Sequence, residues 1–98
     1  METLASNLKS GLADEGYGQV REVIIEQGPD STGEESLFVW LLLDNKVSDK
    51  DLNLEKVESL LSAAREQMRR LQPQFYPYVR VRRQREWQQL QEQELTAS

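Results

Sequence analysis

The sequence predicts a small α+β domain of order β-β-α-β, in which a three-stranded sheet carries one main helix and short helices flank it at both termini. Two stretches rich in apolar residues, 19–27 and 35–44, enclose a cluster of turn-forming residues, a pattern typical of a hairpin. Residues 54–71 place apolar side chains at spacings of three and four, which indicates an amphipathic helix. A third strand is expected at 78–83, beyond Pro73.

The first element is predicted to be a short helix. Leu4, Leu8 and Leu12 are spaced by four, so residues 3–12 can present one apolar face. Glycines at positions 11, 16 and 18 are expected to break the chain there, because glycine is a poor helix former. Residues 13–18 are therefore predicted to be a loop.

The predicted hairpin contains the most informative segment of the chain. Gly28–Gly33 supplies glycine, proline and aspartate for a loop of six residues between antiparallel strands. Side chains alternate between faces along a strand, and on the second strand both faces are apolar: Leu37, Val39, Leu41 and Leu43 on one, Phe38, Trp40 and Leu42 on the other. Both faces therefore require a cover. The main helix supplies one, and the flanking helices, a second copy or a partner protein must supply the other.

The main helix and the elements after it are predicted as follows. Asp51 or Asn53 can cap the helix start, and Pro73 ends the helix. The apolar stripe consists of Leu54, Val57, Leu60, Leu61, Ala64, Met68 and Leu71. On the third strand, Val79 and Val81 are expected to face inward. The glutamine-rich tail 84–95 is either a helix on the open side of the sheet or a partly disordered end.

Length and composition predict one domain, 1–98, with a folded core at about 19–83 and flanking segments 1–18 and 84–98. The chain has no histidine and no cysteine, so it lacks the commonest general base, the commonest metal ligands and a thiolate nucleophile. We therefore expect no enzymatic activity, no catalytic residue, no metal site and no cofactor. The start of the chain lacks the pattern of a signal peptide, and the apolar run Leu37–Leu43 is too short to span a bilayer. The expected location is cytoplasmic.

Two partial motifs and one alternative bear on this expectation. Gly28 and Gly33 have the spacing of a P-loop, but Glu34 and Glu35 stand where that motif requires lysine and serine or threonine. The run from Asp49 to Glu55 resembles the start of a calcium loop, but leucine replaces the glycine of its sharp turn. An enzyme that uses carboxylates with a divalent metal remains an alternative. It requires a cleft that gathers Asp30, Glu34, Glu35 and Asp44.

Charge is distributed unevenly along the chain. Residues 1–64 carry 5 basic and 13 acidic side chains, whereas residues 65–98 carry 7 basic, all arginine, and 4 acidic ones. Arginine pairs with carboxylates and phosphates and stacks on aromatic rings, and aromatic residues are interleaved with this cluster. The alternative to a binding surface is a structural role, in which Arg80 and Arg82 pair with Glu22 and Glu26 across neighbouring strands.

A resemblance to a known group ranks the possible partners. The segments Gly28–Ser31, Leu37–Trp40 and Tyr76–Arg80 resemble those of short, uncharacterised bacterial proteins found as the small partner in toxin–antitoxin-like gene pairs. The resemblance covers about residues 19–83. It implies a small protein that binds a HEPN-type or nucleotidyltransferase-type partner, and it transfers no catalytic residue.

Together these observations predict a small interaction protein, antitoxin-like or regulatory, that binds a protein partner or a second copy of itself. Aromatic residues and arginine dominate binding hot spots, so the expected contact residues are Phe38, Trp40, Arg69, Arg70, Tyr78, Arg80, Arg82 and Trp87. The alternative is a protein that binds RNA or single-stranded nucleic acid through the same arginines and aromatic residues. The net charge of −5 disfavours that alternative. No membrane partner is expected.

Overall fold

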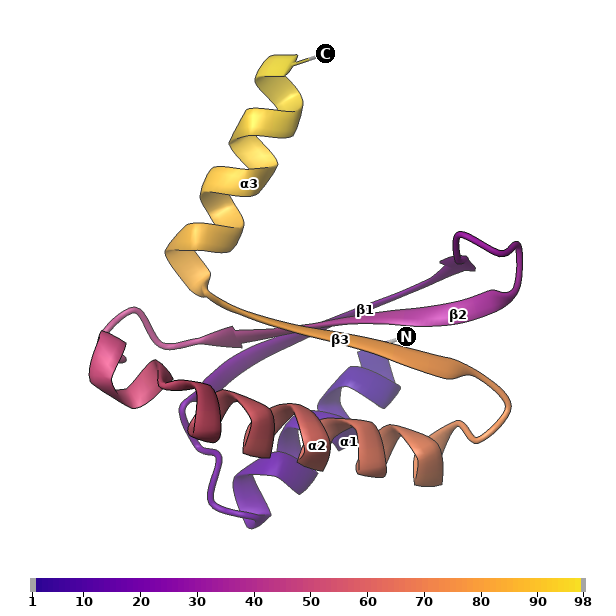
Figure 1. The fold of residues 1–98 in the computed structure, drawn as a ribbon, viewed down its shortest axis with the longest axis horizontal. Helices are drawn as coiled ribbons and strands as arrows, with labels where there is room; N and C mark the ends of the chain where they lie inside the picture. Colours follow the sequence, from indigo (N-terminus) through magenta and orange to yellow (C-terminus); the bar gives the residue numbers. More distant parts are fainter. Residues whose placement is uncertain (1, 98) are drawn as a thin grey trace.

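The structure, a computed structural model, describes residues 2–97, and the side chains of residues 2–93. Its elements follow one another in the order α1 (Glu2–Asp14), β1 (Val20–Pro29), β2 (Glu35–Leu43), the single 3-10 turn η1 (Asp49–Leu52), α2 (Leu54–Leu71), β3 (Tyr76–Arg83) and α3 (Gln84–Ala97) (Figure 1). This order confirms the α+β class, the β-β-α-β arrangement and the flanking helices at both ends.

The three strands form one mixed sheet in the order β1-β2-β3. β1 and β2 pair antiparallel, and β2 and β3 pair parallel, so the strand that is apolar on both faces lies in the middle. β1 extends to Pro29, which pairs with Glu35, so the connection is one residue shorter than the six predicted. Gly33 closes it with a φ of 86°, a conformation that glycine adopts without the steric cost of a side chain.

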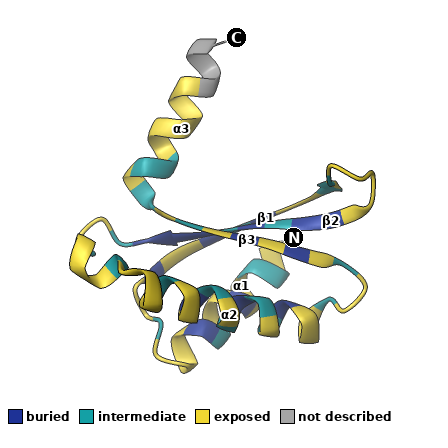
Figure 2. Cartoon of the chain, viewed as in Figure 1, coloured by how far each residue is buried: buried dark blue, intermediate teal, exposed yellow. Residues whose placement is uncertain are grey.

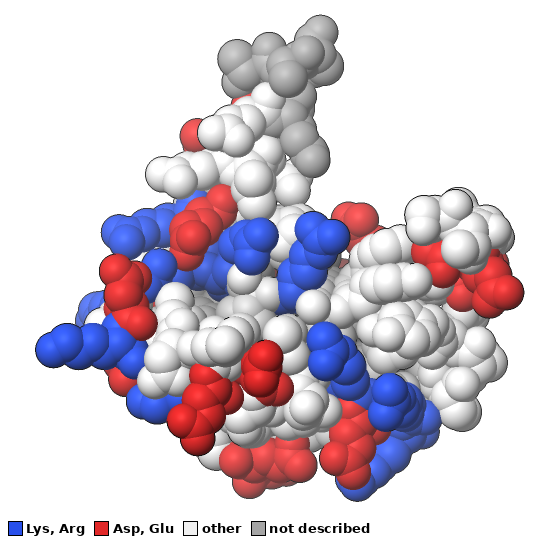
Figure 3. Space-filling view, in the orientation of Figure 1, with Lys and Arg blue, Asp and Glu red and all other residues white. Residues whose placement is uncertain are grey.

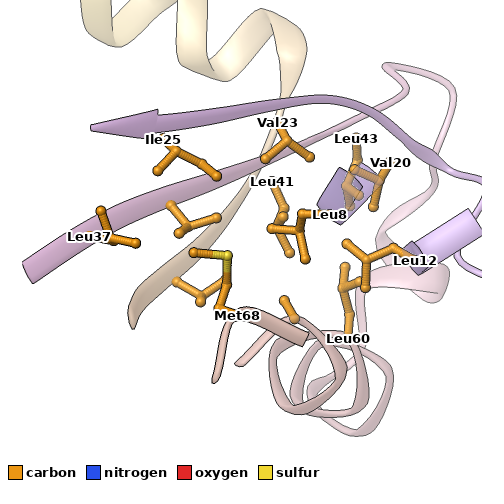
Figure 4. Packing of buried hydrophobic residues seen from close by; sticks show 13 residues of the cluster. Leu8, Leu12, Val20, Val23, Ile25, Leu37, Leu41, Leu43, Leu60 and Met68 are labelled. Carbon is orange, nitrogen blue, oxygen red and sulfur yellow. The ribbon is translucent and has the colours of Figure 1, made fainter. Parts of the chain in front are cut away.

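Both α1 and α2 pack on the same face of the sheet (Figure 1). Between them and the strands lies a single core, in which Leu8 and Leu12 of α1 are completely buried beside Leu41 and Met68 (Figure 4). The core therefore extends beyond residues 19–83, because α1 contributes to it directly. A leucine spacing of four is enough to bury one face of α1 against β1 and α2.

α1 also differs from the prediction at its C-terminal end. It continues through Gly11 to Asp14 instead of ending at residue 12. A Cβ atom added to Gly11 would lie 1.9 Å from Oε1 of Gln67 on α2. The end of the flexible Gln67 side chain therefore occupies the space over Gly11 and would have to move if a side chain were added there. The helix tolerates the low helix propensity of Gly11 because tertiary packing holds it.

The core-facing stripe of α2 is narrower than the sequence indicates. Leu60, Ala64 and Met68 are buried, whereas Leu54 at the start is 73% exposed and Leu71 at the end is 37% exposed (Figure 2). The helix begins as expected, with the Asn53 side chain accepting a hydrogen bond of 2.9 Å from the backbone N–H of Lys56.

α3 begins directly after β3 and confirms one of the two predictions for the tail, a helix. It does not lie along the sheet: it leaves the end of β3 and stands off on the side opposite α1 and α2 (Figure 1). Arg83 fixes the start of α3. The guanidinium of Arg83 donates a hydrogen bond of 2.9 Å to the Val47 carbonyl, and it forms ion pairs with Glu86 at 3.2 Å and Asp49 at 2.5 Å. These two carboxylates raise the pKa of Arg83.

Candidate functional site: the open face of the sheet

The described residues cover the sheet face opposite α1 and α2 only at one end, where Trp87 of α3 packs on Trp40 and Leu42 is 1% exposed; we call this face the open face. Its side chains form three parallel stripes that follow from the strand register. The stripes are Glu22, Ile24 and Glu26 on β1, then Phe38, Trp40 and Leu42 on β2, then Tyr78, Arg80 and Arg82 on β3. The open face is therefore acidic along one edge, apolar in the middle and basic along the other edge.

One end of the open face is a stack of aromatic rings. The Phe38 and Tyr78 centroids lie 5.4 Å apart with an interplanar angle of 15°, and Tyr76 tilts against Tyr78 at 4.7 Å. Tyr76 is 58% exposed and Tyr78 is 39% exposed. Large aromatic side chains with this much free surface are a common feature of binding sites.

Asp30 in the β1–β2 loop holds this stack in place. Its carboxylate accepts hydrogen bonds from the Thr32 hydroxyl at 2.6 Å, the Thr32 N–H at 2.8 Å and the Tyr78 hydroxyl at 3.0 Å. The bonds from Thr32, and then that from Tyr78, lower the pKa of Asp30 from 3.8 to about 2. The same contact raises the pKa of Tyr78. Asp30 thus fixes the Tyr78 ring across 48 residues of sequence.

The other end of the open face is centred on Trp40. Trp87 of α3 packs on Trp40 with ring centroids 4.7 Å apart. The guanidinium carbons of Arg80 and Arg82 lie 5.7 and 5.8 Å from the centroid of the Trp40 ring, within the range of cation–π attraction. Six of the eight predicted contact residues, Phe38, Trp40, Tyr78, Arg80, Arg82 and Trp87, thus meet on one face.

Arg80 and Arg82 form no ion pair with any residue whose side chain is described. The predicted pairing with Glu22 and Glu26 does not occur, because β2 lies between β1 and β3. Strands are about 4.8 Å apart, so the two charged stripes are separated by about 10 Å. Charged side chains gather at the β3–α3 junction, where arginines predominate, and acidic ones gather near the β1–β2 loop (Figure 3).

The remaining two predicted contact residues lie elsewhere. Arg69 and Arg70 are in the last turn of α2, on the opposite side of the sheet, and Arg70 pairs with Glu66 at 2.6 Å. The arginine cluster of the sequence is therefore divided between two surfaces. The contact residues expected from the sequence do not include Tyr76, Asp30 or the acidic stripe. The i, i+4 spacing of Glu22 and Glu26 around Ile24 carried the signal for that stripe, because i, i+2 and i+4 share one face of a strand.

The enzyme alternative requires four carboxylates gathered in one cleft, and the described residues do not provide this arrangement. A shallow groove of about 270 Å³ lies on the open face between Phe38, Trp40, Tyr78 and Arg80. A larger cavity of about 430 Å³ lies at the end of the sheet beside Tyr17, Leu43 and Leu60. Asp30, Glu34 and Glu35 lie at or before the start of β2, whereas Asp44 lies just beyond its end. The four carboxylates are therefore separated by the length of the strand and do not converge. Within the described residues there is no group of three or more acidic side chains arranged to hold a metal ion.

Comparisons of the chain with protein-family models, with curated proteins and with solved structures give no match. Among the described residues, no helix is both long and apolar enough to cross a membrane. The site is therefore interpreted from its own geometry. This geometry consists of an aromatic stack, a tryptophan flanked by two arginines without ion pairs, and an acidic stripe along the opposite edge.

Proposed function

We propose that this chain is a non-catalytic interaction protein that binds another protein chain through the open face. One observation carries the proposal: a sheet with two helices on one face leaves aromatic side chains of the other face in contact with water. A sheet that is apolar on both sides gains stability when both sides are covered. Here α3 covers only the end of the face around Trp40 and Leu42, and Tyr76 and Tyr78 at the other end stay exposed.

The composition of the open face supports a macromolecular partner. Trp, Tyr and Arg are the residue types that contribute most to hot spots when they are desolvated at the centre of an interface. Trp40, Tyr78 and Arg80 lie together at the groove, and Phe38 stacks on Tyr78 beside them. Arg80 and Arg82 have no carboxylate partner among the residues whose side chains are described. Arg82 donates one hydrogen bond of 2.7 Å to the Val81 carbonyl, so both guanidinium groups can still pair with a carboxylate of a ligand.

Charge favours a protein over a nucleic acid. Single-stranded nucleic acid binds to aromatic platforms that lie in a basic groove. On this face, however, Glu22 and Glu26 run parallel to the arginines, and Asp30 contacts Tyr78. A phosphate backbone that crosses the sheet would be repelled by the glutamates along this acidic edge. A protein surface that carries both positive and negative side chains can pair with the acidic edge and the basic edge together. The resemblance to small partners of toxin–antitoxin-like pairs agrees with this choice.

Site-specific photo-crosslinking tests the proposal. A photo-reactive phenylalanine analogue at Tyr76, which is 58% exposed, samples whatever covers the open face. We expect a discrete protein adduct in cells, lost when Arg80→Glu and Arg82→Glu are added. The same analogue at Arg69, on the other side of the molecule, is the control and should give no such adduct. An RNA adduct from position 76 would replace the proposal with the nucleic-acid alternative, and equal adducts from both positions would remove it.

A further inference from the structure

The three stripes of the open face are arranged so that the face is complementary to itself. A two-fold axis parallel to the strands, placed between two facing copies, exchanges the edges of the sheet and keeps the strand direction. The acidic stripe of one copy then lies over the basic stripe of the other, and Phe38 and the part of Trp40 that Trp87 leaves uncovered meet their counterparts in the middle. An axis perpendicular to the strands and parallel to the sheets instead places Glu22 and Glu26 over themselves and Arg80 and Arg82 over themselves, which is repulsive.

The register gives the contacts that follow from the parallel axis. Glu22, Leu42 and Arg82 form one row across the sheet, so Glu22 of each copy faces Arg82 of the other. Glu26 and Arg80 are one row apart, about 7 Å along the strand. Facing sheets pack about 10 Å apart and about 30° from parallel, a gap that long Glu and Arg side chains can bridge. Each contact occurs twice because an isologous interface repeats every pair.

The sheet alone is too small for a standard interface, and α3 can supply more surface. Eight paired positions and three strands give a footprint of about 26 by 14 Å, or roughly 370 Å², whereas a standard interface buries about 800 Å² per partner. α3 stands off the open side of the sheet with Leu90, 37% exposed, one turn beyond Trp87 on the same helix face. The parallel axis brings both copies of α3 to the same end of the assembly, one along each edge.

We infer that the partner on the open face is a second copy of this chain, related by a two-fold axis parallel to the strands. This inference rests on the proposed function and names its partner. It accounts for two features together: arginines without ion pairs on one edge of the face, and glutamates without ion pairs on the other. In the dimer Arg80 and Arg82 of each copy lie against Glu22 and Glu26 of its partner, and Phe38 is removed from water.

Charge exchange between two variants tests this arrangement. One variant carries Glu22→Arg and Glu26→Arg, and the other carries Arg80→Glu and Arg82→Glu. Each variant alone places like charges opposite each other, and we expect self-association at least about 100-fold weaker than in the wild type. When the two variants are mixed, every edge is complementary again. The mixed dimer should return to within about 10-fold of wild-type affinity, measured by sedimentation equilibrium with one variant labelled.

Controls make each result decisive. Arg69→Glu with Arg70→Glu gives the same net charge as the β3 variant but lies outside the proposed interface, and it should dimerise as the wild type does. Recovery on mixing also excludes a folding defect as the cause of the loss. A monomeric wild type, or two variants that do not recover when mixed, overturns the inference. If the chain is monomeric and position 76 crosslinks to a different protein, the inference fails while the proposed function stands; if position 76 yields no adduct, the proposed function fails too.

Discussion

Leu8 provides a direct test of the role of α1, because the side chain is 0% exposed although it lies in a segment that the sequence assigns to a flank. Leu8→Ala removes buried carbon atoms and leaves a cavity between α1 and the sheet. Such substitutions cost about 2.7–5 kcal/mol when the site is fully buried. Domains of this size have a free energy of unfolding of roughly 5–15 kcal/mol. A loss of about 3 kcal/mol corresponds to a fall in Tm of roughly 12–24 °C.

The assay is urea unfolding followed by circular dichroism, at one fixed protein concentration so that self-association affects all variants equally. Leu54→Ala is the matched control, because Leu54 belongs to the same kind of sequence stripe but is 73% exposed. We expect the control to lose less than about 0.5 kcal/mol. If Leu8→Ala loses less than about 1 kcal/mol with an unchanged slope, α1 is not docked on the sheet as described and the extent of the core is wrong.

Two further predictions concern the β1–β2 loop. Gly33→Ala should destabilise the fold by about 1 kcal/mol because of the φ of 86° at this position, whereas Gly18→Ala, which meets no atom within 4 Å, should be nearly neutral in the same urea assay. Asp30 has a pKa of about 2 in the folded chain against 3.8 ordinarily, so its carboxylate stabilises the fold fully above about pH 4 and loses this effect as the pH falls through 2. Asp30→Asn should therefore lower the urea midpoint at pH 7, and the difference from wild type should shrink towards pH 2. A difference that stays constant with pH contradicts the lowered pKa.

Most of the fold follows from local pattern. The hairpin can be predicted from the sequence because turn-forming residues around Gly28 and Gly33 separate two apolar strands. The helix α2 can be predicted because its apolar residues follow a 3.6-residue period and Asn53 caps its start. The errors have physical causes. α1 continues through Gly11 because Leu8 and Leu12 on either side of it are buried in the core, and the exposure of Leu54 depends on how far α2 extends past the edge of the core. Neither property is encoded in the segment itself.

The site was predictable in its residue types and only partly in its location. Aromatic residues and arginines in alternation on 76–82 point to one face of a strand, and the structure brings six predicted residues together there. Arg69 and Arg70 were grouped with them because they are near in sequence, but α2 and β3 lie in different layers. The contact between Asp30 and Tyr78 joins positions 48 residues apart, a distance over which no local pattern gives information.

Strand order determines what the charges on the open face can do. If β3 paired with β1, Arg80 and Arg82 would lie about 4.8 Å from the glutamate stripe and be neutralised within the sheet. Because β2 is central, the same residues form two separate charged edges on either side of an apolar stripe. Separation of the edges leaves each one without an ion-pair partner among the residues whose side chains are described, and makes the face complementary to its own rotated copy. The β2–α2–β3 connection, which sets this order, is thus the element of the fold on which the proposed dimer depends.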